Sequence, residues 1–72
     1  MVQGRVYDRA ETARRIYEAL ERPMTKPEIA EASGLPVTRV KWNLSRMAKQ
    51  YLVVYDHKLI KWRRSESSEL PN

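Results

Sequence analysis

Basic side chains are concentrated in the second half of this 72-residue chain. Residues 1–33 carry six Lys/Arg and six Asp/Glu, so their formal charges cancel. Residues 34–64 carry eight Lys/Arg against the single acid Asp56, a formal charge of +7, and residues 65–72 carry only two acids. A positive field on one part of a molecule attracts a polyanion. The chemistry favoured by these side chains is therefore electrostatic binding of a nucleic acid, with an ordinary solvated surface as the alternative.

Residue types that support catalysis or metal binding are scarce. The sequence has one histidine, His57, no cysteine, and two glycines, Gly4 and Gly34. It therefore offers no thiolate metal site, no disulfide framework and no glycine-rich phosphate loop, and no carboxylate pair marks a cleft. It also contains no signal peptide and no apolar run long enough to span a membrane. We expect a non-enzymatic, cytoplasmic protein with no cofactor, no metal and no evident small-molecule effector.

The elements that must position the basic residues begin with a short helix opening at Thr25. Thr25 and Glu28 have the spacing of a capping box, in which two side chains satisfy free amides at the helix start. Met24 and Ile29 occupy the two positions of a hydrophobic staple around that cap. Gly34 follows the last helical residue, where a left-handed conformation ends a helix at little steric cost. A tight turn is therefore expected at residues 34–36.

A second helix is expected over residues 36–50, beginning at Pro36 or the residue after it, because proline has its φ already set for a helix start. Val40, Leu44 and Met47 recur at i, i+4 and i+7, which predicts one buried side. The opposite side is polar and basic. Its members are Thr38, Trp42, Ser45 and Lys49, flanked by Arg39, Lys41 and Arg46.

Another helix is expected before these two, from a cap at Asp8 to about Glu21, where the approach to Pro23 disfavours further helix. One apolar stripe repeats along it at helical spacing. Its members are Ala13, Ile16, Tyr17 and Leu20.

Residues 51–62 are rich in β-branched and aromatic types with a polar break, which predicts a β-hairpin. If residues 57 and 58 form a two-residue loop, Tyr55 pairs with Ile60 and Val53 with Trp62, and these four share an apolar face. A slightly longer loop stays open, because the glycine or asparagine favoured by two-residue turns is absent. Residues 1–7 are expected to form an arm and residues 65–72 a disordered acidic tail.

Three helices followed by a basic hairpin, over residues 8–64, resemble the winged helix-turn-helix domains of bacterial, archaeal and viral transcription regulators. The matching pattern includes Ala30, Gly34, Val40 and Leu44, followed by the sequence Tyr-Leu-Val that leads into the wing. Asn43 departs from older wingless patterns, which prefer an apolar residue there, and Pro36 replaces the usual Ser or Thr cap. The resemblance implies an α+β, mainly α fold.

The resemblance also implies sequence-specific binding to double-stranded DNA by a small transcriptional regulator. Helix 36–50 would enter the major groove, and the wing, residues 51–64, would lie on the backbone or the minor groove. The residues expected at the DNA are Pro36, Val37, Thr38, Arg39, Lys41, Trp42, Ser45, Arg46, Lys49, Lys58, Lys61, Arg63 and Arg64.

Several alternatives stay open from sequence alone. The wing lysines could merely protect an edge strand from aggregation. Trp42 could contact DNA or fold back on the protein, whereas Trp62 is expected in the core. The chain could instead be a protein-interaction module of a transcription or replication assembly, or bind RNA. Because 72 residues give a thin core, a homodimer would help stability, but nothing in the sequence requires one.

Overall fold

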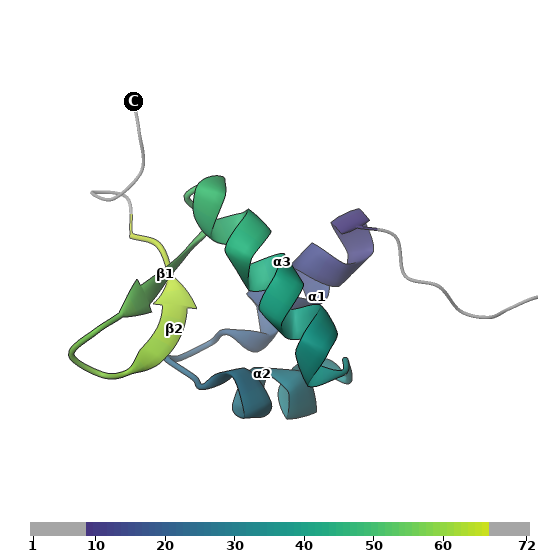
Figure 1. The fold of residues 1–72 in the computed structure, drawn as a ribbon, viewed down its shortest axis with the longest axis horizontal. Helices are drawn as coiled ribbons and strands as arrows, with labels where there is room; N and C mark the ends of the chain where they lie inside the picture. The colour runs from purple at the N-terminus through teal and green to yellow at the C-terminus, as the bar shows by residue number, and fades with distance from the viewer. Residues whose placement is uncertain (1–8, 67–72) are drawn as a thin grey trace, which may run out of the picture.

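The computed structural model describes residues 9–66 (Figure 1). The expected arm, the expected Asp8 cap and residues 67–72 of the expected tail lie outside the described residues. Three helices are followed by a two-stranded antiparallel sheet, which confirms the α+β, mainly helical winged-helix arrangement. The elements are α1 (Arg9–Ala19), α2 (Lys26–Ser33), α3 (Val37–Lys49), β1 (Val53–Asp56) and β2 (Lys61–Arg64).

Both ends of α2 are fixed by the local signals in the sequence. The Glu28 N–H donates to Thr25 Oγ1 at 3.4 Å, and the Thr25 N–H donates to Glu28 Oε1 at 2.8 Å, which confirms the capping box. Gly34 ends the helix with a left-handed φ of 76°, and its N–H donates to the Ala30 carbonyl. Pro36 has an extended ψ of 149° and precedes the first residue of α3 as its cap. The turn therefore sets the direction of α3 relative to α2.

The core lies where the three helices and β1 meet. Val40, Leu44 and Met47 are at most 1% exposed, which confirms the buried side of α3. Around them are Ile16, Leu20, Met24, Ile29, Ala30, Leu35 and Val53, with Trp62 packed against the cluster.

The buried stripe of α1 differs from the expected one. Thr12 is buried at 2% exposure, whereas Tyr17 is 37% exposed and Ala13 only half-buried. Ile16 and Leu20 are buried as expected, so the stripe runs through Thr12, Ile16 and Leu20 at i, i+4 and i+8, with Thr12 in place of Ala13 and Tyr17. A threonine in the interface between α1 and α3 carries no hydropathy signal, so the sequence pattern favoured its apolar neighbours.

The hairpin has a longer loop and a different register from the favoured prediction. Tyr55 pairs with Trp62 and Val53 with Arg64, two positions away from the expected partners. A shift of two preserves the sides, so Val53, Tyr55 and Trp62 still share a face, and the Tyr55 and Trp62 rings meet edge to face at 5.3 Å. Trp62 therefore takes the place expected for Ile60, opposite Tyr55, and Arg64 takes the place expected for Trp62, opposite Val53.

The cause of that register is the chemistry of the loop, residues 57–60. The Asp56 carboxylate accepts the N–H groups of Lys58 and Leu59 at 2.9 and 3.1 Å, and the Ile60 N–H donates to the Asp56 carbonyl at 2.7 Å. Asp56 thus closes a four-residue loop in the absence of Gly or Asn. Ile60 adopts a left-handed φ of 56° and is 68% exposed, so the prediction that it lies on the apolar face is wrong.

The wing is attached to the helices along the second edge of β2. The Met24 N–H donates to the Trp62 carbonyl at 2.8 Å, and the Trp62 N–H donates to the Met24 carbonyl at 2.7 Å. Beyond the strand, the Ser65 N–H donates to the Leu52 carbonyl. These backbone bonds fix the wing relative to the segment between α1 and α2, so the wing and α3 keep one mutual orientation.

Candidate nucleic-acid interface

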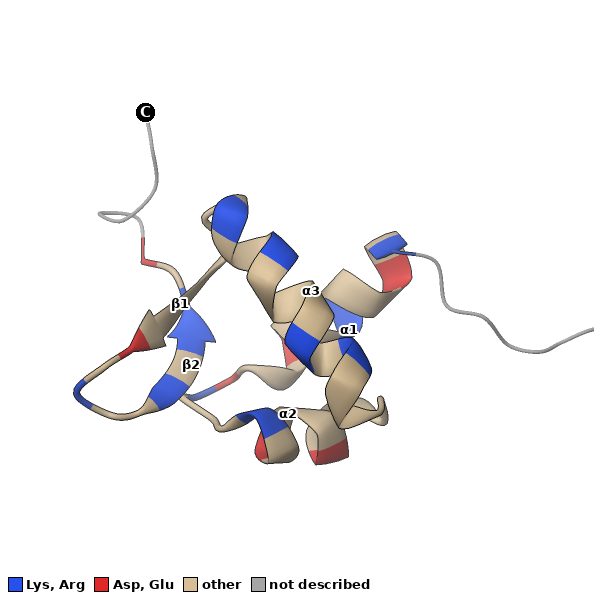
Figure 2. Ribbon diagram, in the orientation of Figure 1, with Lys and Arg blue, Asp and Glu red and all other residues tan. Residues whose placement is uncertain are grey.

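The outward side of α3 is polar and basic. Thr38, Arg39, Lys41, Trp42, Ser45 and Lys49 are exposed, and Arg46 is half-buried. The helix contains four Lys/Arg and no acid, and Figure 2 shows the basic residues distributed along its length. Since the other side of the same helix is fixed in the core, this surface is held in place.

Trp42 is 68% exposed, so its indole ring does not fold back into the core. Lys41 Nζ lies 6.0 Å from the centre of that ring, at the outer limit of a cation–π contact. An exposed apolar ring beside an ammonium group can contact a deoxyribose or a thymine methyl while the ammonium group faces phosphate. Val37, 45% exposed at the first turn of α3, adds a second apolar contact of this kind.

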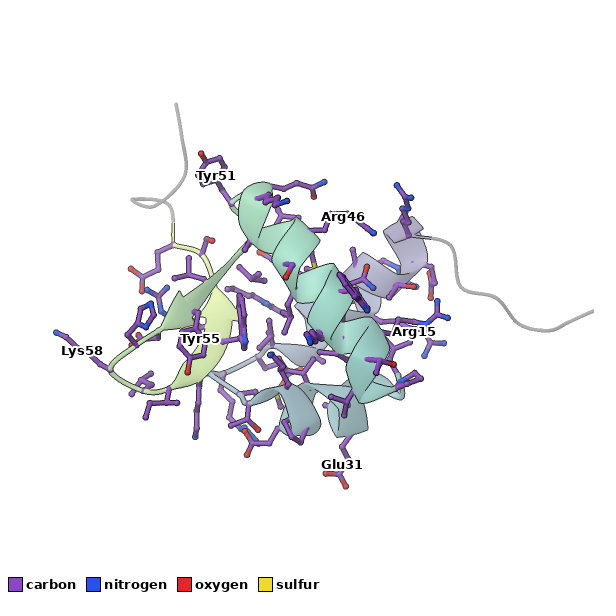
Figure 3. The ribbon with its side chains drawn as sticks, viewed as in Figure 1. Arg15, Glu31, Arg46, Tyr51, Tyr55 and Lys58 are labelled. Atoms are coloured by element: carbon purple, nitrogen blue, oxygen red, sulfur yellow. The ribbon has the colours of Figure 1, made fainter. Side chains whose placement is uncertain are left out.

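The basic residues of the wing fall into two groups: lysines described by their exposure, and arginines that donate hydrogen bonds within the protein. Lys58 is exposed at the tip of the hairpin, where Figure 3 shows it pointing away from the molecule, and Lys61 is half-buried near the base of the loop. Arg63 Nε lies 3.2 Å from Asp56 Oδ2, and its Nη1 donates to the Arg64 carbonyl. The carboxylate Asp56, the only acid of residues 34–64, therefore already has a partner.

Arg64 contacts the end of α1. Its Nε donates to the Tyr17 carbonyl at 2.8 Å and its Nη2 to the Glu18 carbonyl at 3.3 Å, and its guanidinium lies 4.5 Å from the centre of the Tyr17 ring. The last turn of α1 contains no basic residue of its own, so Arg64 supplies the cation that the carboxyl end of a helix favours. Sequence reasoning missed this role, because the two positions are more than forty residues apart.

Hydrogen bonds and ion pairs hold several carboxylates in their charged form. The Leu59 N–H and the Arg63 guanidinium lower the pKa of Asp56. The Thr25 N–H lowers the pKa of Glu28, with a smaller effect from the charge of Lys61.

On α1, hydrogen bonds from Arg14 and then Arg15 lower the pKa of Glu11. Arg14 Nη2 lies 2.6 Å from Glu11 Oε1, and Arg14 Nη1 lies 3.1 Å from Glu18 Oε2. The charges of α1 are therefore largely paired with one another, whereas α3 has only basic charges.

Within residues 9–66, no group of three or more His, Cys, Asp and Glu side chains is arranged to hold a metal ion. In the same part of the chain, no helix has the length and apolar character needed to cross a membrane.

The comparison with known families agrees with this geometry. Neither the curated proteins nor the solved structures include a match to the chain. The model of a family described as winged helix-turn-helix DNA-binding matches residues 9–50, more than half of the chain, from the first residue of α1 to the residue after α3. The hairpin lies beyond the matched residues, so the evidence for it comes from the structure. The chain therefore belongs to the winged helix-turn-helix DNA-binding family.

Proposed function

We propose that this protein binds double-stranded DNA sequence-specifically as a small transcriptional regulator, with residues 8–64 as the DNA-binding unit. The observation that carries the proposal is the outward side of α3, which is basic, free of acids and backed by a buried apolar side. Family membership supports DNA as the polyanion. In this arrangement α3 enters the major groove and the wing lies on the backbone or the minor groove.

We assign base reading to the amino-terminal part of the outward side of α3. Thr38 and Arg39 lie in its first turn, and an arginine can form two hydrogen bonds with one guanine. Trp42 and Ser45 extend the contact with the bases along the major groove. Pro36 and Val37, at the start of the helix, lie next to this contact. Such a bidentate pair contributes about 1–3 kcal/mol of discrimination between bases.

We assign phosphate binding to the remaining basic residues of α3 and to the wing lysines. These are Lys41, Arg46, Lys49, Lys58 and Lys61. Arg63 and Arg64 donate within the protein, to the Asp56 carboxylate and to the last turn of α1. Their main effect on binding is therefore to hold the wing in position, and any remaining guanidinium donors would face the backbone.

Substitutions separate base reading from phosphate binding. After selection of a preferred duplex from a random library, we expect Arg46→Ala and Lys61→Ala to weaken the selected and random duplexes by the same factor. Thr38→Ala and Arg39→Ala should instead reduce the ratio between the two affinities. Arg14→Ala is the matched control, because Arg14 is on α1 and paired with two glutamates. Equal losses on both duplexes from all four α3 and wing variants would contradict this division.

Salt dependence distinguishes the proposal from its alternatives. Each neutralised phosphate contributes a slope of about −0.9 in log K against log salt, so five such contacts give roughly −4.5. Absence of salt-sensitive duplex binding would favour a protein-interaction module instead. Stronger competition by duplex RNA than by duplex DNA would favour RNA binding. Sedimentation with and without duplex would establish whether a homodimer reads two half-sites about one turn apart.

A further inference from the structure

A groove of about 360 Å³ lies between α1 and α3, beside the outward side of α3. Three arginines, here called the rim arginines, line it: Arg9 from α1, and Arg39 and Arg46 from α3. Among residues 9–66, no acid lines it. Figure 3 shows Arg46 projecting from α3 on the side of the amino-terminal end of α1. We call this feature the arginine groove.

Two buried polar residues also line the arginine groove. Thr12 is 2% exposed and Asn43 7% exposed, on the facing sides of α1 and α3. The Asn43 Nδ2 donates to the Arg39 carbonyl at 2.8 Å, a bond within α3. Asn43, which departs from the apolar preference of wingless patterns, thus gives the groove a polar wall.

The three rim arginines differ from the other arginines of α1 and the wing. Arg14, Arg15 and Arg63 each lie within ion-pair distance of a carboxylate. Over residues 9–66, no ion pair joins the rim arginines to an acid. Like charges that line one groove repel one another, and an anion bound there offsets that repulsion.

We propose that Arg9 and Arg46 hold a phosphate of the DNA backbone in the arginine groove, on the strand beside the major groove that α3 enters, while Arg39 keeps the base-reading role assigned above. The inference rests on the proposed function and extends it to α1. No residue of α1 was expected to contact DNA. Guanidinium groups bind phosphate oxygens through paired hydrogen bonds, so arginine suits this role better than lysine. A strand phosphate fits better than a small free anion, because the groove is open and the exposed ring of Trp42 lies at its edge.

The test is the salt dependence of duplex binding by Arg9→Ala. We expect its affinity for selected and random duplexes to fall by the same factor, about 3–10-fold at low salt. We expect its slope to become shallower by less than the roughly 0.9 of a whole phosphate, because Arg46 still faces the shared phosphate. Arg9→Lys should restore the slope but only part of the affinity. Arg14→Ala, which removes a paired charge from the same helix, should leave the slope unchanged. Circular dichroism establishes that each variant folds.

Two negative outcomes are distinguishable. If the unsubstituted protein shows a steep slope and Arg9→Ala keeps it, the arginine groove does not hold a phosphate and the proposed function stands. If the unsubstituted protein shows no salt-sensitive binding, both proposals fail. A double variant of Arg9 and Arg46 adds a further check. If Arg9 and Arg46 share one phosphate, Arg9→Ala combined with Arg46→Ala should reduce duplex affinity by less than the product of the two single fold-losses. A reduction equal to that product would overturn the shared site.

Discussion

Arg64→Ala tests whether this wing arginine stabilises the fold or contacts DNA. The substitution removes two hydrogen bonds to carbonyls of the last turn of α1 and the contact with the Tyr17 ring. An exposed cation–π contact contributes about 0.5–1 kcal/mol. Hydrogen bonds from a charged donor contribute about 1.5–3 kcal/mol when buried, which solvent screening at this exposed position reduces to roughly 0.5–1 kcal/mol for the two together.

We therefore expect Arg64→Ala to lower the free energy of unfolding by about 1–2 kcal/mol. For a domain of this size that corresponds to a decrease in Tm of about 5–15 °C. Thermal unfolding followed by circular dichroism at 222 nm measures it. Arg64→Lys should recover little of the loss, because an ammonium group cannot donate in the same fork geometry.

The matched control is Lys58→Ala, which removes a charge from the tip of the same hairpin. It should leave Tm unchanged and weaken DNA binding. The reverse pattern would refute the reasoning: an Arg64→Ala protein with an unchanged Tm and a shallower salt slope would make Arg64 a DNA contact and not a link between the wing and α1.

The remaining predictions concern backbone conformation and pH. Gly34→Ala should destabilise by about 1–2 kcal/mol, because φ is 76° and the left-handed region disfavours a Cβ, although the added atom would have ordinary space. Ile60→Asn should raise Tm, since asparagine adopts the left-handed φ of 56° more easily and the isoleucine buries little surface. The carboxyl pKa values of Asp56, Glu28 and Glu11 are lowered in the folded state, so the unfolded chain binds more protons in acid. Stability from these groups is therefore present above their ordinary values of 3.8 and 4.5 and is lost as pH falls below them. Urea unfolding at a series of pH values measures this loss, and a midpoint that rises below pH 4 would contradict it.

Features set by neighbouring residues were predictable from the sequence. The start of α2 follows from the capping box, which depends on two residues three positions apart. Its end follows from Gly34, which lacks a Cβ and can adopt the left-handed conformation. The buried side of α3 follows from apolar residues at i, i+4 and i+7, because a helix places them together whatever it packs against. These features also direct Thr38 and Arg39 outward, so the exposed side of the interface followed from them.

Features set by contacts between distant segments were not predictable. The register of the wing is a local exception, because Asp56 closes the loop by accepting the N–H groups of Lys58 and Leu59. The sequence left this longer loop open, but the apolar pattern favoured the two-residue loop. The role of Arg64 depends on its distance from the end of α1. The arginine groove depends on the rotation of α1, which buries Thr12 and brings Arg9 to the side of α3.

Mapping of amide chemical shifts on a duplex titration tests the central claim most directly. If the outward side of α3 and the wing bind DNA, the largest changes should occur over residues 37–49 and 57–61, together with Arg9. Changes restricted to α2 and the paired charges of α1, or no change at low salt, would contradict the account.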